Sequence, residues 1–201
     1  PLTRKNIGAS FSNILNIFKD AYKNIPFRKI CLATFLVFNS FQTIAAFSFF
    51  IIVHYLFSGD ASAAGIWPTL HGSIGAVITT LLVIPVVSKM AQKFGKKQTF
   101  IVSQSISIIG YILFWFLFIP GKPYMFLYAL PFFSFGIGGL FTIMMSMTAD
   151  VCDYEELQNG LPRREGAFGA IYWWMVKLGT ALAGLFAGII MWYVGFAPDA
   201  A

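Results

Sequence analysis

The residues best suited to chemistry gather between positions 150 and 177, where charged groups meet an apolar segment. Five of the eight acidic residues and two arginines fall within positions 150–165. A long apolar segment follows, and its one charge is Lys177. Charged groups placed inside or beside a membrane segment can bind ions, form ion pairs or line a solute pathway. The acidic residues are Asp150, Asp153, Glu155, Glu156 and Glu165, and the arginines are Arg163 and Arg164.

Lys177 lies deep in its apolar segment. It follows Arg164 by thirteen residues, which is about 20 Å of helix at 1.5 Å per residue. If the arginines mark the membrane surface, the lysine lies near the middle of the hydrocarbon layer, where an isolated lysine costs about 2.5–3.5 kcal/mol. We therefore expect it to face a wet cavity or a carboxylate on another helix. A buried ion pair that only fixes helix packing is the alternative.

Aromatic side chains near Lys177 suggest a sugar as the solute. Trp173 lies one helical turn before Lys177 on the same face, and Trp174 is its neighbour. An aromatic ring beside a cation in a polar cavity suits a sugar, because the C–H faces of the sugar stack on the ring while its hydroxyls form hydrogen bonds. Phe141, in the preceding apolar segment, offers a second wall. Ordinary packing of Trp173 between helices is the alternative.

The charges before this segment form a candidate gate network. Asp150 and Asp153 lie at the end of one apolar segment, and Glu165 lies at the start of the next, where a helix N-terminus favours a carboxylate. The two arginines can pair with these acids or with carboxylates elsewhere in the protein, and so hold the cytoplasmic side of a transporter closed. A solvated run of charges is the alternative. The network comprises Asp150, Asp153, Tyr154, Glu156, Arg163, Arg164 and Glu165.

Other site chemistries lack their residues. Cys31 and Cys152 suggest neither a disulfide nor a metal site. His54 and His71 have no metal-ligating partners at the usual spacing, and no nucleotide or nucleophile motif occurs. The sequence therefore predicts no enzyme, no cofactor and no metal site in this chain. His71 lies inside an apolar segment, where we expect a hydrogen bond to another helix rather than a proton relay.

The elements that must position these residues are transmembrane helices. Hydrophobic residues make up 58% of the chain and charged residues 11%, and the mean hydropathy is +0.74. Soluble proteins have roughly 45–50% apolar and about 25% charged residues. The composition therefore predicts an all-α integral membrane protein in the lipid bilayer. It excludes a nucleic-acid-binding protein, because the basic residues lie in short loops between apolar segments.

The apolar segments predict five spans after a short linker. Residues 1–27 carry apolar residues at helical spacing, which predicts an amphipathic helix along the membrane surface. We expect it to end at Asn24-Ile25-Pro26, because a residue before proline leaves the helical conformation. Residues 28–201 form the transmembrane bundle. The predicted spans are 29–57, 65–88, 99–119, 124–148 and 166–194.

Small residues predict where these helices approach one another closely. Gly72 and Gly75 mark one face of the second span, and a run of small residues at 136–139 lies in the fourth. Gly184 and Gly188 lie four residues apart in the fifth.

The basic residues predict the orientation. Twelve lie in residues 1–29, in the loop between the second and third spans and in the loop before the fifth span, whereas the opposite side has only Lys122. Because cytoplasmic loops carry the excess of lysine and arginine, we expect a multi-pass protein of the inner cell membrane with the N-terminus of the chain in the cytoplasm. Five spans is an odd number, and we expect a sixth beyond them.

The charged stretch also carries a family resemblance. The run ADVCDYEELQNGLPRREG, followed by a helix with a lysine in mid-span, resembles the glycoside–pentoside–hexuronide:cation symporters, the melibiose-carrier family of the major facilitator superfamily. The Asn-x-Pro-Phe before the first span and the lysine-rich Phe-Gly-Lys-Lys loop are similar to that family as well. The residues that match its motif are Asp150, Asp153, Tyr154, Glu155, Arg163, Arg164, Glu165 and Gly166.

The resemblance implies a place for the chain in a larger protein. The five spans would be helices 7–11 of twelve, the C-terminal half of a major facilitator protein with its last helix missing. The partner would be the N-terminal six-helix half of the same protein. Lys177 would be the family's helix-eleven lysine, near the sugar and the coupling ion. The family's cation-binding carboxylates lie in the absent N-terminal half, which leaves Na⁺ or H⁺ open as the coupling ion.

Residues and resemblance together predict a secondary active symporter of a glycoside or related sugar, coupled to Na⁺ or H⁺ by alternating access. One alternative is a cation-coupled carrier of another amphiphilic solute, such as a lysolipid. Another is a membrane sensor that transports nothing.

Overall fold

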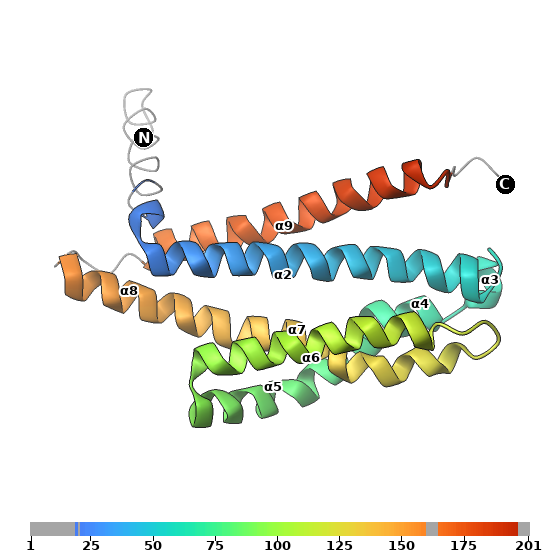
Figure 1. Cartoon of the computed structure of the whole chain (residues 1–201), viewed down its shortest axis with the longest axis horizontal. Helices are drawn as coiled ribbons and strands as arrows, with labels where there is room; N and C mark the ends of the chain where they lie inside the picture. Colours follow the sequence, from blue (N-terminus) through green and yellow to red (C-terminus); the bar gives the residue numbers. More distant parts are fainter. Residues whose placement is uncertain (1–18, 20, 160–164, 197–201) are drawn as a thin grey trace, which may run out of the picture.

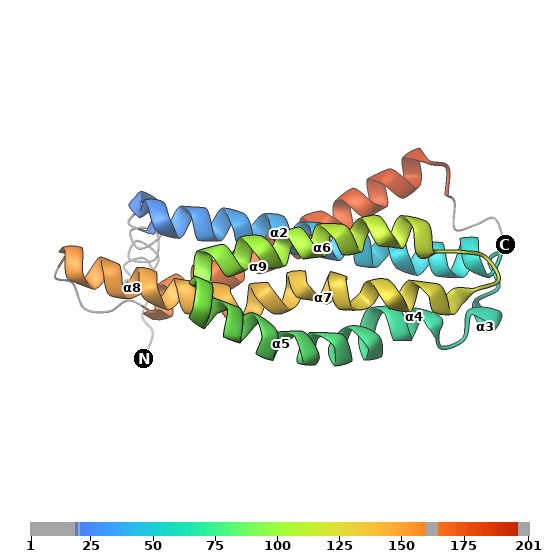
Figure 2. The same ribbon diagram turned by 60° about the horizontal axis from the view of Figure 1, so that its bottom comes forward.

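The computed structural model describes residues 19, 21–159 and 165–196. These residues form long helices joined by short turns, and no strand occurs among them. Within them, five helical segments are long and apolar enough to cross a membrane. The helices run roughly along one axis, and both views show their connections at the two ends of the bundle (Figures 1 and 2). The prediction of an all-α membrane fold with five spans is confirmed.

The five spans contain the following elements. The first is α2 (Ile25–Phe50) with η1 (Ile51–Leu56), and the turn after it holds α3 (Ala61–Ala64). The second is α4 (Trp67–Thr69), η2 (Leu70–Ile74) and α5 (Gly75–Phe94), and the third is α6 (Lys96–Leu117). The fourth is η3 (Pro123–Ala129), α7 (Leu130–Gly139), η4 (Leu140–Met144) and α8 (Met145–Asn159), and the fifth is α9 (Glu165–Tyr193).

The first span begins at a helix cap that the sequence marks by Asn24 and Pro26. The side-chain oxygen of Asn24 accepts a hydrogen bond of 3.0 Å from the backbone N–H of Phe27, and Pro26 lies in the first turn. Proline suits that position because the first N–H groups of a helix have no partner within the helix. The predicted break is therefore present at Asn24, but Ile25 and Pro26 already lie in α2, so the first span begins at Ile25 rather than at position 29. Most of the predicted linker, residues 1–27, lies outside the described residues.

The turn between the second and third spans is shorter than the sequence predicts. Residues 89–98, predicted as a loop, are helical except for Gly95. Lysine, glutamine, methionine and alanine favour helix, so α5 continues to Phe94. Gly95 then adopts a φ of +82°, which glycine reaches without steric cost. The third span therefore begins at Lys96 rather than at position 99.

The fourth span also extends further than predicted. Its end was predicted at position 148, but α8 continues to Asn159 and carries the charged stretch from Asp150 onward. Neither glycine nor proline occurs between Asp150 and Asn159, so nothing local breaks the helix. The acidic side chains therefore project from a helix rather than from a loop.

Three π-helical segments interrupt the spans, and the sequence analysis missed all three. They are η1, η2 and η4, and a 3-10 segment, η3, opens the fourth span. A π turn inserts about one residue, but in a span that is apolar on all sides the inserted residue interrupts no visible pattern. These segments carry His54, His71 and Phe141.

The spans form a structural repeat. Pro123 follows Ile25 by 98 residues, and Glu165 follows Trp67 by the same 98 residues, so the fourth and fifth spans correspond to the first and second. Packing follows the same relation, since α2 packs along α9 and α7 packs along α5. The second unit begins after three spans and so has the opposite direction across the membrane. Inverted repeats of this kind are common in secondary transporters.

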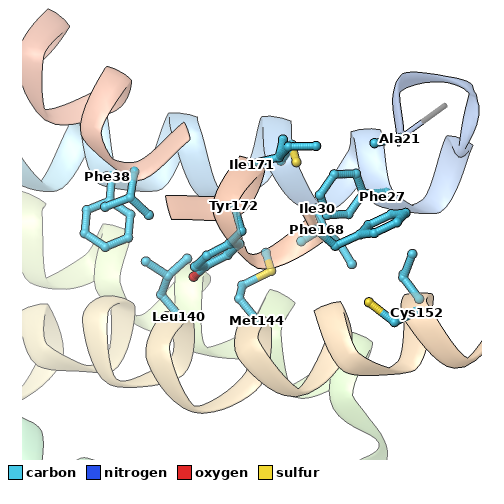
Figure 3. Packing of buried hydrophobic residues seen from close by; sticks show 13 residues of the cluster. Ala21, Phe27, Ile30, Phe38, Leu140, Met144, Cys152, Phe168, Ile171 and Tyr172 are labelled. Atoms are coloured by element: carbon cyan, nitrogen blue, oxygen red, sulfur yellow. The ribbon is translucent and has the colours of Figure 1, made fainter. Parts of the chain in front are cut away.

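α2, α8 and α9 enclose one of the apolar cores (Figure 3). The rings of Phe27 and Phe168 meet edge to face, with their centroids 4.4 Å apart. Tyr172 is fully buried in this core. Further along, Asn39 Nδ2 donates a 3.3 Å hydrogen bond to the carbonyl oxygen of Gly179. This core fixes which face of α9 is turned toward α2.

The predicted close approach at positions 136–139 is present between α6 and α7. A Cβ at Gly139 would lie 2.6 Å from Cβ of Ser103, and a Cβ at Gly136 would overlap Ser107. Gln104 Nε2 also donates a 3.0 Å hydrogen bond to the carbonyl oxygen of Gly136. Small residues on both helices therefore bring the two backbones together.

The two glycines of the second span differ. A Cβ at Gly75 would overlap the side chain of Leu130, whereas a Cβ at Gly72 would meet no atom within 4 Å. The prediction of a close-packing face is thus confirmed at Gly75 and wrong at Gly72 within the part of the chain that the structure describes.

Candidate functional site

Lys177 lies in the middle of α9 on the face turned away from α2. It follows Glu165 by twelve residues and precedes Tyr193 by sixteen, so about 18 Å and 24 Å of helix separate it from the two ends. Its side chain is exposed, and it has no hydrogen bond or ion pair to any described residue. A lysine ammonium at this depth needs water or a carboxylate from outside the described helices.

Glycines lie on the same face of α9 before and after Lys177. Gly166, Gly184 and Gly188 lie eleven residues before, seven after and eleven after Lys177, which places all four within about 20° of one line along the helix. A Cβ at any of these glycines would meet no described atom within 4 Å. The predicted close-packing face at Gly184 and Gly188 is therefore open here. Such a face lets another helix approach closely.

Trp173 borders the same face. Its side chain is 45% exposed, and it lies one turn before Lys177. The ring of Tyr172 contacts it edge to face at 5.8 Å between centroids. Tyr172 is fully buried in the core, so this contact helps to position the Trp173 indole, nearly half of which stays exposed.

Phe141 lies in η4, on a different part of the structure. Its side chain is 39% exposed, and its ring meets that of Phe38 on α2 edge to face at 5.6 Å. Among the described residues, no ring contact joins Phe141 to Trp173. The structure therefore places Trp173 and Lys177 on one face of α9. Phe141 is held elsewhere, by its contact with Phe38 of α2.

The charged network has a partner that the sequence analysis did not name. Lys96, the first residue of α6, contacts both carboxylate oxygens of Asp150 on α8, at 2.6 and 2.7 Å. Its Nζ also lies 3.5 Å from the carbonyl oxygen of Ser146. The helical conformation of residues 96–98 and of Asp150 brings these groups together. The predicted loop, residues 89–98, included Lys96, and for that reason the sequence did not indicate it as a helix residue that could reach Asp150.

The remaining network residues are placed in part. Arg163 and Arg164 lie outside the described residues, so their pairing stays a prediction. Tyr154 accepts a 2.7 Å hydrogen bond from Gln158 Nε2 one turn later. Asp153 and Glu156 are exposed on α8, and Glu165 lies in the first turn of α9, as predicted. Within the described residues, no group of three or more metal-ligating side chains could hold a metal ion.

His71 has no hydrogen bond to another helix within the described residues, so that prediction is wrong. The side chain is buried, and its Nε2 has no partner. Four phenylalanine rings surround the imidazole at centroid distances of 5.0–6.1 Å. The π-helical turn η2 places the histidine toward this aromatic group, and the sequence pattern gave no sign of it. The rings are those of Phe114, Phe118, Phe126 and Phe133.

Comparison with known families decides the class of this structure. The family model described as "MFS/sugar transport protein" matches residues 4–201. The chain belongs to this family. The resemblance seen in the sequence is thereby confirmed at family level: the chain is a multi-pass membrane protein of a sugar transport family and not an enzyme.

Curated relatives agree with the family. A glucuronide carrier protein homolog of Escherichia coli (strain K12) is 28% identical over 90% of this chain and 38% of its own length. A putative sulfoquinovose importer of the same strain is 25% identical over 94% of this chain and 38% of its own length. An uncharacterized symporter of Bacillus subtilis (strain 168) is 27% identical over 63% of this chain and 26% of its own length.

The chain thus spans less than two fifths of the length of these relatives. No solved structure matches it.

Proposed function

We propose that the protein is a symporter that moves a glycoside, hexuronide or related sugar with Na⁺ or H⁺ by alternating access. The observation that carries the proposal is Lys177, an exposed cation in the middle of a membrane-spanning helix. A cation at that depth is costly unless it meets water or a carboxylate, and ionisable residues inside membranes mark substrate or ion pathways. The proposal places the chain as helices 7–11 of a twelve-helix protein.

The open face around Lys177 supports a partner in the N-terminal six-helix half. The glycines at 166, 184 and 188 would let a helix of that half lie against α9. A carboxylate on that helix could then pair with Lys177 and bind the coupling ion in turn. The coupling ion would change the charge of this pair and so bias the two states of the transporter.

Trp173 supports a sugar as the cargo. Its indole contacts Tyr172 edge to face, is partly exposed and lies one turn from Lys177. A hexuronide or a sulfonated sugar has both a C–H face for the ring and an anionic group for the ammonium. The named relatives include a glucuronide carrier homolog and a sulfoquinovose importer, and we extend that class of solute to this chain as part of the proposal.

The cluster of Lys96 and Asp150 supports a gate at the end of the bundle that we assign to the cytoplasm. It joins the first residue of α6, next to the turn between the second and third spans, to α8 of the fourth span. Arg163 and Arg164 would add their charges to this cluster. An ion-pair network at one end of a transporter can close that end in one state and separate in the other.

The experiment is uptake of labelled glucuronide by the full-length protein in liposomes, driven by an imposed Na⁺ or H⁺ gradient. The proposal expects uphill accumulation with one of the two gradients and none when that gradient is removed. It also expects an unlabelled glucuronide or sulfoquinovose to compete. Competition by a lysolipid but not by either sugar would contradict the sugar assignment, and an absence of all flux would favour a sensor.

A further inference from the structure

Gln42 is a polar residue in the middle of the first span. It follows Ile25, the first residue of α2, by 17 residues and precedes Leu56, the last residue of η1, by 14, so about 26 Å and 21 Å of helix separate it from the two ends. Its side chain is partly buried, and it has no hydrogen bond to any described residue. Lipid cannot supply one, and an amide without a partner is costly in a membrane. Gln42 therefore needs a partner from outside the described helices.

The contacts of α2 show which way Gln42 faces. Asn39 Nδ2 donates its hydrogen bond to the carbonyl oxygen of Gly179 on α9, and the ring of Phe38 meets that of Phe141 in η4. At about 100° per residue, Gln42 lies about 60° from Asn39 and about 40° from Phe38 around α2. It lies between these two directions. Gln42 therefore faces the seam between α9 and η4.

This seam is open on one side of Gln42. At Gly179 the two helices lie close together, since an added Cβ would lie 2.9 Å from the carbonyl oxygen of Phe35. Toward the C-terminal end of α9, α2 and α9 spread apart in both views (Figures 1 and 2). Phe49 follows Gln42 by seven residues on the same side of α2, and its side chain is 51% exposed. The described residues therefore leave the seam uncovered beyond Gln42.

Gln42 lies near the depth of Lys177 in the bundle. Gly179, the partner of Asn39, follows Lys177 by two residues, and Gln42 lies about 4.5 Å along α2 from Asn39. Phe141 borders the seam at this level from a π-helical segment, and such segments are frequent at functional sites. Because Lys177 lies on the face of α9 turned away from α2, Lys177 and Gln42 would contact different parts of one solute.

We propose that Gln42 determines the specificity of the solute site, where its amide binds hydroxyl groups of the sugar and the ring of Phe141 packs against the C–H face. An amide offers donors and an acceptor, and sugar hydroxyls both donate and accept. A site built to bind a hydroxyl group discriminates against a solute that lacks it, because the amide is then left unpaired. This inference rests on the proposed sugar symport and adds to it the residue that recognises the uncharged part of the solute.

Uptake of labelled glucuronide by the full-length protein in liposomes tests the inference. Gln42→Leu removes the amide, and Ser40→Ala is the matched control, because Ser40 is exposed and lies about 160° from Gln42 around α2. We expect Gln42→Leu to raise the KM for glucuronide roughly tenfold, since hydrogen bonds to the sugar are lost. The maximal rate and the dependence on the coupling ion should change little, as for a residue that binds solute. Ser40→Ala should retain the wild-type KM.

A second variant, Gln42→Cys, distinguishes solute binding from a role in folding. The native Cys31 and Cys152 are buried, so a charged methanethiosulfonate reports on the introduced thiol. We expect the reagent to react with Gln42→Cys. Glucuronide at about ten times its Kd should slow that reaction roughly tenfold by mass action. Glucuronide should not slow any reaction of Ser40→Cys.

Three outcomes would overturn the inference while leaving the proposed function intact, provided that wild-type protein accumulates glucuronide. One is an unreactive Gln42→Cys, which would mean that another helix covers the residue. Another is a reactive Gln42→Cys that glucuronide does not protect. The third is a changed ion dependence of Gln42→Leu with an unchanged KM for glucuronide, which would assign Gln42 to the ion site. If Gln42→Leu does not fold, the protection of Gln42→Cys decides. Absence of sugar uptake by the wild type would overturn the proposed function and this inference together.

Discussion

Lys96 and Asp150 form a close ion pair whose side chains are 37% and 56% exposed. Exposed ion pairs contribute little to stability, because water screens the charges and two long side chains lose freedom. We expect a double-mutant cycle of Lys96→Ala and Asp150→Ala, measured by thermal unfolding, to give a coupling of about 0.2–1 kcal/mol. Lys97→Ala is the control, since this neighbouring lysine is exposed. A coupling above roughly 3 kcal/mol would mean that the pair is buried in the full-length protein.

His71 is a second residue whose surroundings lead to a prediction about stability. Its unpaired Nε2 lies among four phenylalanine rings, and an unsatisfied buried polar group costs about 1–3 kcal/mol. We expect His71→Leu to leave the melting temperature unchanged or to raise it by a few degrees, because the substitution removes that nitrogen at similar volume. The measurement is thermal unfolding in detergent. A fall of more than a few degrees would show that His71 has a partner in the full-length protein.

At the scale of elements, the contact between α6 and α7 depends on small residues. A Cβ at Gly110 would lie 2.9 Å from the carbonyl carbon of Phe132 and 3.0 Å from its Cβ. Since backbone cannot move aside as a flexible side chain can, Gly110→Ala should cost about 1–3 kcal/mol. We expect a lower melting temperature for this variant. Gly72→Ala is the matched control, because a Cβ there meets no described atom; equal effects of the two variants would contradict the packing.

The elements also show what the sequence could and could not predict. Apolar length and composition were enough for the five spans, because membrane helices must satisfy their backbone hydrogen bonds internally. The ends of the helices were predicted less accurately. Helix-favouring residues extend α5 to Phe94 and α8 to Asn159, beyond the apolar residues from which the ends were predicted. The π turns were missed because the spans are apolar on all sides, so an inserted residue interrupts no visible pattern. Depth and spacing marked Lys177 and Trp173 as candidates, whereas the partner of Asp150 depended on how α6 meets α8.

At the scale of the whole molecule, the excess of basic residues at one end predicts the orientation. Lys93 lies in the last turn of α5, at one end of the bundle. Lys122 lies at the opposite end, just after α6. We expect a membrane-impermeant maleimide to label Lys122→Cys in intact spheroplasts and to label Lys93→Cys only after permeabilisation. The native Cys31 and Cys152 are buried, so they add little background. The reverse pattern would invert the proposed topology.

The inverted repeat connects these scales. It makes α9 the counterpart of α5. One face of α9 packs on α2, and the face with the exposed Lys177 is left uncovered by the described helices. We propose that this face meets the N-terminal half, so substitution of Lys177 should change transport coupling.

The central claim is that Lys177 couples the ion to the solute, and liposomes with the full-length protein test it most directly. Two rates are compared for Lys177→Ala: uphill glucuronide accumulation under the driving ion gradient, and exchange of labelled for unlabelled glucuronide without a gradient. Lys122→Ala is the control, because that lysine lies in an exposed turn. The account predicts that Lys177→Ala lowers uphill accumulation at least tenfold, while Lys122→Ala retains it. Undiminished uphill accumulation by Lys177→Ala, at equal amounts of folded protein, would contradict the account.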